Sequence, residues 1–467
     1  MTVRKTLTGA VLATAAVLLL TACSDDGTAG DDNTITVQST VSGPQPVTIG
    51  TTDKVSALDP AGAYDRGSLT VMSQVYQFLY TFTGDSAIPT PDAAEKCEFI
   101  TPTEFNCTLR SGLMFANGHA LTSSDVKFSY DRMLAIASDL GPVALLSNLA
   151  AVTAWDDLTV SFTLHRPDAQ TWPLLLATSA GAIVDEEVFN PVALTPDAMI
   201  VAANAFSGPY GIRTYRLNDV IEYLPNPAYH GAYGPAQNPG VTLKTFVDSA
   251  NLSLAVALGE VDVAYRSLLP ADIKELQANS ALKVWQADGG ESRYLAFNFA
   301  AQSGATEAQR LAVRQAAASL VDRQALATDV YLGQYTPLCS WVPSQYTDDA
   351  TAVCDEYGAV PDTIGAREYL VAAEVSIPVE LDLWYNSDNY GPASTQEYEV
   401  IQQQLETSGL FSVTLYSESW GSYHAAVAAG KYPAYQMSSF PDYPAADNYL
   451  DPLVNALDQT AAQQLYD

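Results

Sequence analysis

The segment Ser417–Tyr449, SESWGSYHAAVAAGKYPAYQMSSFPDYPAADNY, carries the clearest signal of the fold class. It opens with a helical pattern that includes Trp420 and Tyr423 and ends at Gly430, a residue type common just after helices. A strand follows over Ala434–Phe440 and leads into a proline-rich turn. This succession of helix, strand and turn predicts an α/β protein.

Asp442 is the carboxylate that this turn presents, between prolines and aromatic residues. A charge-assisted hydrogen bond in a partly dry site is roughly twice as strong as a neutral one, so this position suits a ligand ammonium group. The alternative is a plain turn residue, because an aspartate in such a turn often bonds its own backbone. Trp420 is likewise either a ligand contact or a part of the core.

The chain on the N-terminal side of this segment continues the α/β pattern. The expected elements are strand Tyr294–Phe299, helix Thr306–Tyr331, strand Val379–Tyr385, helix Thr395–Ser408 and strand Phe411–Leu415. The long helix is amphipathic. The residues expected on its buried face are Leu311, Leu320, Val321 and Leu326.

The first half of the chain predicts a larger mixed region. Its best-defined helix covers Asp125–Ile136, because Thr122-Ser-Ser-Asp125 is a capping box. The other expected elements are strand Val47–Gly50, helix Leu69–Tyr80, hairpin Cys97–Leu109, strand Trp155–Leu164, strands Tyr210–Tyr215 and Val220–Leu224, helix Ser249–Leu258, strand Glu260–Ala264, helix Ala271–Gln277 and strand Leu282–Gln286.

The N-terminus has the pattern of an export signal. Arg4 and Lys5 precede an apolar run, Leu7–Leu20, which is too short to span a membrane stably. Leu20-Thr-Ala-Cys23 then resembles a bacterial lipobox, in which Cys23 is lipidated and becomes the mature N-terminus. The alternative is a plain signal peptide with a chance cysteine. Residues 1–22 are therefore expected to be a signal, and residues 23–46 a flexible acidic tether.

The charge of the chain excludes one class of partner. The precursor has a net charge of −32, and without Arg4 and Lys5 it has 19 basic and 53 acidic residues, a net charge of −34. Such an acidic body repels nucleic acids, so none is expected as a partner.

Catalysis and metal binding find little support. The histidines are scattered at positions 119, 165, 230 and 424, without the spacing of a metal site. The segment around Ser179, Ala-Thr-Ser-Ala-Gly, lacks the first glycine of a nucleophile elbow. We therefore expect a protein that is not an enzyme and has neither a bound metal nor a cofactor.

The remaining cysteines suggest disulfides. Cys97 and Cys107 bracket a predicted hairpin, while Cys339 and Cys354 bracket a polar loop. Four thiols allow three pairings, of which these near pairs are favoured. Free buried thiols are the alternative, although an oxidising compartment disfavours them.

Several segments in order resemble the peptide- and nickel-binding class of extracytoplasmic solute-binding proteins, family 5, of ABC importers. They are Ser56-Ala-Leu-Asp-Pro60, the LRSG…ANG…LTSSDVKFSYDR stretch within Cys107–Met133, Phe206-Ser-Gly-Pro-Tyr210 with Asn226-Pro227 and Tyr229, Ala257-Leu-Gly-Glu-Val-Asp262, and Val313-Arg-Gln-Ala316 with Val321-Asp-Arg323. The resemblance covers almost all of the mature chain. The resemblance depends on the order and spacing of these segments taken together. The lipobox agrees with it, because family members in Gram-positive bacteria are usually lipoproteins.

The resemblance implies a two-lobed, hinged α/β fold of the periplasmic-binding-protein type, class II or cluster C, which closes over a ligand. It assigns residues 47–293 to the first lobe, with an inserted subdomain at about 66–200. Residues 294–467 form the second lobe, with an incomplete return to the first. Family members usually continue further, so an end at Asp467 suggests a truncated chain.

The resemblance also implies site residues. In oligopeptide-binding members an aspartate pairs with the ligand ammonium and an upstream tryptophan lines a side-chain pocket, and Asp442 and Trp420 match them. Lys54-Val55-Ser56 occupies the place of a strand that pairs with peptide backbone. The other residues assigned to the ligand site flank Asp442 and are Ser438, Ser439, Phe440 and Tyr443.

Two departures bear on the ligand. The family usually has Gly-Trp where this chain has Ser438-Ser439, and the frequent Asp-Tyr-Pro-Asp-Pro is here Asp442-Tyr-Pro-Ala-Ala446. We expect a lipid-anchored, monomeric receptor on the outer face of the membrane of a Gram-positive bacterium. It would deliver short peptides, or similar ammonium-bearing solutes, to the transmembrane permease and its ATPases. The alternatives are a receptor of the same fold for a neutral solute such as a sugar and, with least support, a secreted hydrolase.

Overall fold

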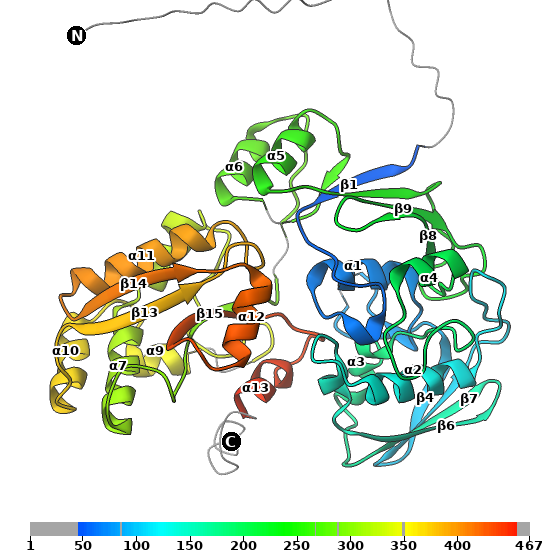
Figure 1. The fold of residues 1–467 in the computed structure, drawn as a ribbon, viewed down its shortest axis with the longest axis horizontal. Coiled ribbons are helices and arrows are strands. Elements are labelled where there is room, and N and C mark those ends of the chain that lie inside the picture. Colours follow the sequence, from blue (N-terminus) through cyan, green and yellow to red (C-terminus); the bar gives the residue numbers. More distant parts are fainter. Residues whose placement is uncertain (1–44, 85, 267, 287–288, 348–350, 455–467) are drawn as a thin grey trace, which may run out of the picture. The chain divides into compact units, whose positions relative to one another are not determined.

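The computed structural model describes residues 45–84, 86–266, 268–286, 289–347 and 351–454 (Figure 1). The described residues belong to one compact unit. The predicted signal, Cys23 and nearly all of the tether lie outside the described residues.

The first sheet has the strand order β11-β1-β10-β9-β8. Its strands are β1 (Val47–Thr51), β8 (Tyr210–Arg216), β9 (Val220–Pro225), β10 (Val241–Thr245) and β11 (Val263–Ala264). β1 is parallel to both of its neighbours, whereas β9 is antiparallel to both β10 and β8. The helices of this region are α1 (Arg66–Val75), α4 (Asp197–Ala203), α5 (Ser249–Ala257) and α6 (Pro270–Ala278), with a 3₁₀ turn η1 at Pro60–Gly62. The predicted strand at Val47–Gly50 and the predicted hairpin that follows Gly208 are confirmed.

The second sheet is antiparallel and has the order β4-β5-β7-β6. Its strands are β4 (Ala94–Thr101), β5 (Glu104–Leu109), β6 (Leu149–Asp156) and β7 (Thr159–Leu164). Helix α2 (Ser123–Ile136) packs on β6 and β7, and its capping box at Thr122 and Asp125 is present as predicted. Nearby are β2 (Tyr80–Thr81), β3 (Thr90–Pro91), α3 (Trp172–Leu175), η2 (Val143–Leu146) and η3 (Ser179–Gly181).

The third sheet has the order β12-β15-β13-β14. Its strands are β12 (Ser292–Phe297), β13 (Val379–Tyr385), β14 (Phe411–Ser417) and β15 (Ala434–Ser439). The helices of this region are α7 (Glu307–Leu320), α8 (Arg323–Ala325), a π-helix η4 (Leu326–Val330), α9 (Ala352–Tyr357), α10 (Thr363–Ala372), α11 (Ser394–Thr407) and α12 (Trp420–Ala428). Residues of α7, α10 and α11 share one buried core with β13 and β14 (Figure 1). The helix, strand and turn expected over Ser417–Tyr449 are confirmed.

After β15 the chain returns to the second sheet. Tyr443 is 4% exposed and belongs to the core cluster beneath β5 and β7. Thr171 donates a hydrogen bond of 2.7 Å to Asp447, the first residue of α13 (Asp447–Val454). The boundaries expected for the two lobes, 47–293 and 294–467, stay a prediction, because residues 44–467 form one compact unit.

Two expected elements of the first half are wrong because turn chemistry intervenes. The predicted strand Trp155–Leu164 is a hairpin, in which Asp156 accepts the N–H groups of Leu158 and Thr159 at 2.9 Å each. The predicted helix Leu69–Tyr80 ends at Val75. Its carbonyl accepts the N–H groups of Ser207 and Gly208, and a side chain at Gly208 would collide with that helix end.

The expected helix Thr306–Tyr331 and strand Leu282–Gln286 are also wrong. The helix stops at Leu320, because Asp322 begins a new turn by accepting the N–H of Ala325. Leu311, expected to be buried, is 43% exposed. Residues 282–286 form no strand, and the strand expected at Glu260–Ala264 is confined to Val263–Ala264.

Both expected disulfides are present. Cys97 and Cys107 lie opposite one another on β4 and β5, so their bond closes a paired hairpin. Cys339 and Cys354 join an irregular segment to α9. The predicted pairing is therefore confirmed.

Candidate ligand site

Asp442 follows β15 and lies in a polar contact set drawn from distant parts of the chain. The hydroxyl of Tyr64 donates a hydrogen bond to its Oδ1. Asn448 accepts the Asp442 N–H at 3.0 Å and donates weakly to Oδ2 at 3.4 Å. Burial raises the pKa of Asp442, and the hydrogen bonds from Tyr64 and Asn448 oppose that rise.

No cationic side chain compensates this carboxylate. Among the residues that the structure describes, Asp442 forms no ion pair with a lysine, arginine or histidine. A buried carboxylate without a positive partner is costly, and a cation that reaches it therefore gains more than it would in water. Asp442 thus has the properties of an ammonium acceptor.

Arg66 is linked to the Asp442 turn through Phe440. Its guanidinium is 4.8 Å from the ring centroid of Phe440, two residues before Asp442. The same guanidinium pairs with Glu291 at 2.5 Å, and both side chains are less than one-fifth exposed. Arg66 is the first residue of α1, whereas Glu291 immediately precedes β12. The pair therefore joins an element of the first sheet region to the edge of the third sheet.

Arg293 extends the charged cluster into the third sheet. It lies 3.6 Å from both Glu291 and Glu397, and its Nη1 donates to the hydroxyl of Tyr331 at 2.7 Å. Burial alone would raise the pKa of Glu291, but the guanidinium groups of Arg66 and Arg293 outweigh this effect, and the pKa is lowered overall. Burial raises the pKa of Glu397. Nε of Arg293 and Oε1 of Glu291 are buried without a hydrogen-bond partner, so this cluster has spare polar capacity.

Trp420 belongs to an aromatic cluster rather than to the contact set of Asp442. It is the first residue of α12, and its ring lies 5.4 Å from Tyr390, 5.3 Å from His424 and 6.2 Å from Tyr423. The cluster connects with the charged one through the carbonyl of Tyr390, which accepts a hydrogen bond from Arg293. In the described part of the chain, no hydrogen bond or ring contact joins Trp420 directly to Asp442.

The segment Lys54-Val55-Ser56 lies just after β1. The backbone N–H of Val55 donates to the side chain of Asn218 at 2.7 Å, and that side chain donates back to the Val55 carbonyl at 3.2 Å. The N–H of Ser56 donates to Ser68. The side chain of Lys54 is exposed. In this arrangement the backbone of Val55 is occupied, and pairing of this segment with a ligand stays a prediction.

The other predicted residues divide between two environments. Ser438 and Ser439 end β15 opposite Arg293 and Ser292 of β12. Phe440 is 46% exposed beside Arg66. Tyr443, by contrast, is buried in the core of the second sheet. The structure thus brings Phe440 and Asp442 together with Tyr64 and Arg66. The ring of Tyr443 packs in the core of the second sheet, and its hydroxyl donates to Asp447 at 3.3 Å.

The sequence reading missed the residues that surround Asp442. Tyr64, Arg66 and Glu291 come from segments far apart in the chain, and no local pattern connects them. One signal was available. Arg293 immediately precedes the predicted strand Tyr294–Phe299, and Glu291 lies two residues before Arg293, in a chain with only 21 lysine and arginine residues. A charge beside a buried strand calls for a partner.

The described residues contain neither a cluster suited to a metal ion nor a helix suited to span a membrane. No group of three or more histidine, cysteine, aspartate or glutamate side chains in the described ranges is arranged to hold a metal ion. Among the helices that the structure describes, none is both long and apolar enough to cross a membrane.

Comparison with known proteins identifies relatives. The family model for bacterial extracellular solute-binding proteins, family 5 (Middle), matches residues 89–460. The probable D,D-dipeptide-binding periplasmic protein DdpA of Escherichia coli (strain K12) is 26% identical over 318 residues, which cover 65% of this chain and 58% of the relative. This chain therefore aligns with little more than half of that relative.

Solved structures show the same fold at low sequence identity. The periplasmic binding protein DppA from Helicobacter pylori, in complex with the peptide STSA, matches with a TM-score of 0.72 at 17% identity, over 87% of this chain and 80% of that one. AgaA from A. tumefaciens R10, in complex with agropinic acid, matches with a TM-score of 0.70 at 22% identity, over 86% and 79%. The expected two-lobed, periplasmic-binding-protein-like α/β fold is thereby confirmed.

Proposed function

The chain belongs to the bacterial extracellular solute-binding proteins of family 5, and from that premise we propose that it captures short peptides, or similar ammonium-bearing solutes, for an ABC importer. Its named relatives are binding proteins rather than enzymes. The proposal places the ligand ammonium at Asp442.

The observation that carries this proposal is the state of Asp442. It is half-buried, it accepts hydrogen bonds from Tyr64 and Asn448, and it has no ion-pair partner within the described residues. A ligand ammonium would add a charge-assisted hydrogen bond at a place where water is largely excluded. Breaking one such buried charge pair typically costs 2 to 5 kcal/mol of binding free energy.

Hinge closure couples this recognition to transport in the proposal. A ligand shifts an open–closed equilibrium only by its preference for one state. A shift from mostly open to mostly closed requires about 5.5 kcal/mol of such preference. Tyr64 and Arg66 come from the proposed first lobe, whereas Asp442 comes from the second. Asp442 lies where the chain returns from the third sheet to the core of the second. In the proposal, an ammonium held there therefore favours the closed state through the further contacts that the ligand makes with both lobes.

A neutral solute such as a sugar remains the second candidate. The observation that favours it is the aromatic cluster of Tyr390, Trp420 and Tyr423, with the ring of Trp420 partly exposed. Such a ligand would stack on Trp420 and would tolerate loss of Asp442. The agropinic acid bound by AgaA illustrates that proteins of this fold differ in ligand.

The proposal also places the protein outside the cell membrane. Cys23 would carry the lipid, residues 24–46 would form the tether, and the monomeric body would deliver its ligand to the transmembrane permease. Two or three acyl chains give stable anchoring, at about 0.8 kcal/mol per buried CH₂. Labelling with a radioactive fatty acid tests the anchor. The label should appear on the wild-type precursor and be absent from the Cys23→Ala variant.

Calorimetry tests the ligand class. The chain from Ser24 onward is titrated with di- to pentapeptide pools, and matched pools with acetylated N-termini serve as the control. We expect heat of binding only from the free-amine pools. Equal binding of both pools would remove the ammonium from the proposal. Binding of oligosaccharides in place of peptides would favour the neutral-solute function.

A further inference from the structure

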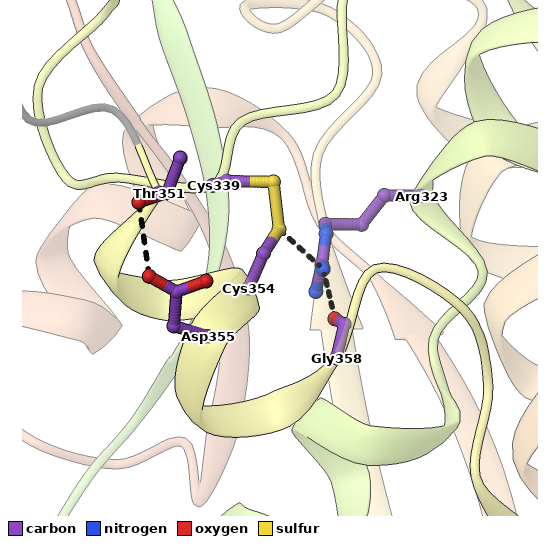
Figure 2. Close-up of a disulfide and its surroundings, with 6 residues drawn as sticks. All are labelled: Arg323, Cys339, Thr351, Cys354, Asp355 and Gly358. Atoms are coloured by element: carbon purple, nitrogen blue, oxygen red, sulfur yellow. Dashed lines mark hydrogen bonds between the residues drawn. A yellow bond between two sulfur atoms is a disulfide. The ribbon is translucent and has the colours of Figure 1, made fainter.

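The Cys339–Cys354 disulfide lies in surroundings unlike those of Cys97–Cys107. The Nη2 atom of Arg323 lies 3.3 Å from Sγ of Cys354 and donates at the same time to the carbonyl of Gly358 at 2.8 Å. Figure 2 shows the guanidinium held between the sulfur and that carbonyl. Both cysteines are half-buried, so their sulfur atoms are not sealed in a core.

The hairpin disulfide offers a direct contrast. Cys107 is 1% exposed and belongs to the core of the second sheet. Its partner, Cys97, lies directly opposite it in the β4–β5 ladder. No cationic group contacts either sulfur among the described residues. Cys97 itself is half-buried, like Cys339 and Cys354, so the contrast between the two disulfides depends on the buried Cys107, on the paired strands and on the guanidinium beside Cys354.

We propose that Cys339–Cys354 is a thiol–disulfide exchange site that reacts with a dithiol, and that Arg323 directs the reaction. A thiolate of the dithiol attacks Sγ of Cys339, the Cys339–Cys354 bond breaks, and Cys354 leaves as a thiolate. A guanidinium next to a thiolate stabilises it, and a thiol of lower pKa leaves faster.

The second thiol of the dithiol completes the exchange. It attacks the mixed disulfide, releases Cys339 as a thiol and closes the disulfide of the dithiol. Two electrons pass from the dithiol to the protein. The proton of the attacking thiol is released to water, the proton of the second thiol ends on Cys339, and Cys354 remains a thiolate beside Arg323. No other oxidant or reductant is required.

The bond fastens a segment that contacts the third sheet's edge. Within residues 339–347, Gln345 donates to the carbonyl of Gly289 at 3.4 Å, and the ring of Tyr346 stacks 5.7 Å from that of Tyr449. The hydroxyl of Tyr449 donates to the carbonyl of Gly290. The next residue is Glu291, the partner of Arg66.

Reduction would therefore loosen contacts beside the charged cluster. Residues 336–347 contain no helix or strand. The disulfide restrains this segment together with the buried Val342 and the contacts of Gln345 and Tyr346. An effect on ligand capture follows only if the proposed function is correct. The exchange chemistry itself does not depend on that function, so the two can fail separately.

The test compares the two disulfides in one native protein. The whole chain from Ser24 onward is treated with dithiothreitol at pH 7 and trapped with iodoacetamide, and peptide mass spectrometry follows each cysteine. We expect Cys339 and Cys354 to become labelled at least about tenfold faster than Cys97 and Cys107. Equal rates, or faster reduction of the hairpin disulfide, would overturn the proposal.

A second measurement tests whether Arg323 stabilises the Cys354 thiolate. In the reduced protein, the pH profile of alkylation should place the thiolate of Cys354 at lower pH than that of Cys339. Arg323→Gln should remove this difference, Arg323→Lys should retain part of it, and Arg213→Gln, which removes an exposed charge elsewhere, should leave it unchanged. A merely structural Arg323 predicts one profile for both cysteines in every variant, which would overturn its directing role.

Hydrogen exchange measures the coupling. Reduction should raise amide exchange in residues 289–293 and 339–347, whereas the strands β4 and β5 keep their protection. Unchanged exchange at residues 289–293 would show that the segment does not transmit its redox state to Glu291.

Discussion

Asp59, which is buried, and Asp442, which is half-buried, both have a proline neighbour, but their carboxylates are paired in different ways. Asp59 is 1% exposed and receives two hydrogen bonds of 2.8 Å from the guanidinium of Arg132. It also accepts the N–H groups of Ala61 and Thr195. Within the part of the chain that the structure describes, the side-chain donors to Asp442 are Tyr64 and Asn448.

The difference separates scaffold from site. A buried carboxylate whose positive partner belongs to the chain fixes the chain, and here it ties the turn at η1 to α2. A carboxylate that is removed from water without such a partner can still pair with a cation, and that cation must come from a ligand. By this reasoning Asp59 maintains the fold and Asp442 is reserved for a ligand.

The largest expected effect is on the scaffold aspartate. Asp59→Asn would leave Arg132 buried without its counter-ion, and removing one partner of a buried pair typically costs 3 to 5 kcal/mol. Urea unfolding measures this loss. Asp442→Asn is the matched control, and its unfolding free energy should stay within about 1 kcal/mol of the wild type or exceed it, because it removes a buried charge without a cation. Equal losses in the two variants would break the comparison.

A smaller effect should appear in the pH dependence of Asp442. Burial raises its pKa, so the folded protein holds this proton more tightly than the unfolded chain does. Between the ordinary value of 3.8 and the raised one, its contribution to stability therefore increases as the pH falls. Peptide binding should weaken over the same range, because an ammonium pairs with the carboxylate and not with the acid.

Other carboxylates near Asp442 also titrate, so the contribution of Asp442 is obtained as the difference between the wild type and Asp442→Asn. Glu397 also has a raised pKa, whereas that of Glu291 is lowered. Urea unfolding and calorimetry from pH 4 to pH 7.5 are therefore compared between the wild type and Asp442→Asn. A wild-type affinity that does not change over this range would contradict the assignment.

The smallest expected effect comes from Tyr64. Its hydroxyl lowers the pKa of Asp442 against the larger effect of burial. Tyr64→Phe should raise that pKa further and move the loss of peptide binding to higher pH. Tyr233→Phe, which removes a hydroxyl that bonds Thr81 and the carbonyl of Phe82 away from the site, is the control. A shift in the opposite direction would show that Tyr64 competes with the ligand ammonium for Asp442.

The sequence predicted the elements that local rules determine. The capping box at Thr122, the hairpin closed by Cys97 and Cys107, and the helix–strand–turn around Asp442 all depend on residues close together in the chain. Errors arose where a single polar side chain redirected the backbone. Asp156 turns one expected strand into a hairpin, and Asp322 interrupts one expected helix.

The surroundings of the site could not be predicted in the same way. Asp442 was identified by its place in a resemblance, but its donor Tyr64 lies 378 positions away. The Arg66–Glu291 pair is likewise a product of tertiary structure. The predicted role of Lys54-Val55-Ser56 stays open, because Asn218 holds the backbone of Val55. Polar groups that pair across long sequence separations produce no periodic pattern, so these partners could not be predicted from the sequence.

The central claim is that Asp442 recognises an ammonium, and a double-mutant cycle tests it most directly. Calorimetry is done with one peptide from the free-amine pool and its N-acetylated form, on the wild type and on Asp442→Asn. We expect either change alone to weaken binding at least about 30-fold, and both together to weaken it hardly further, because each removes the same interaction. Losses that simply multiply, or a variant that binds the free-amine peptide as the wild type does, would contradict the account.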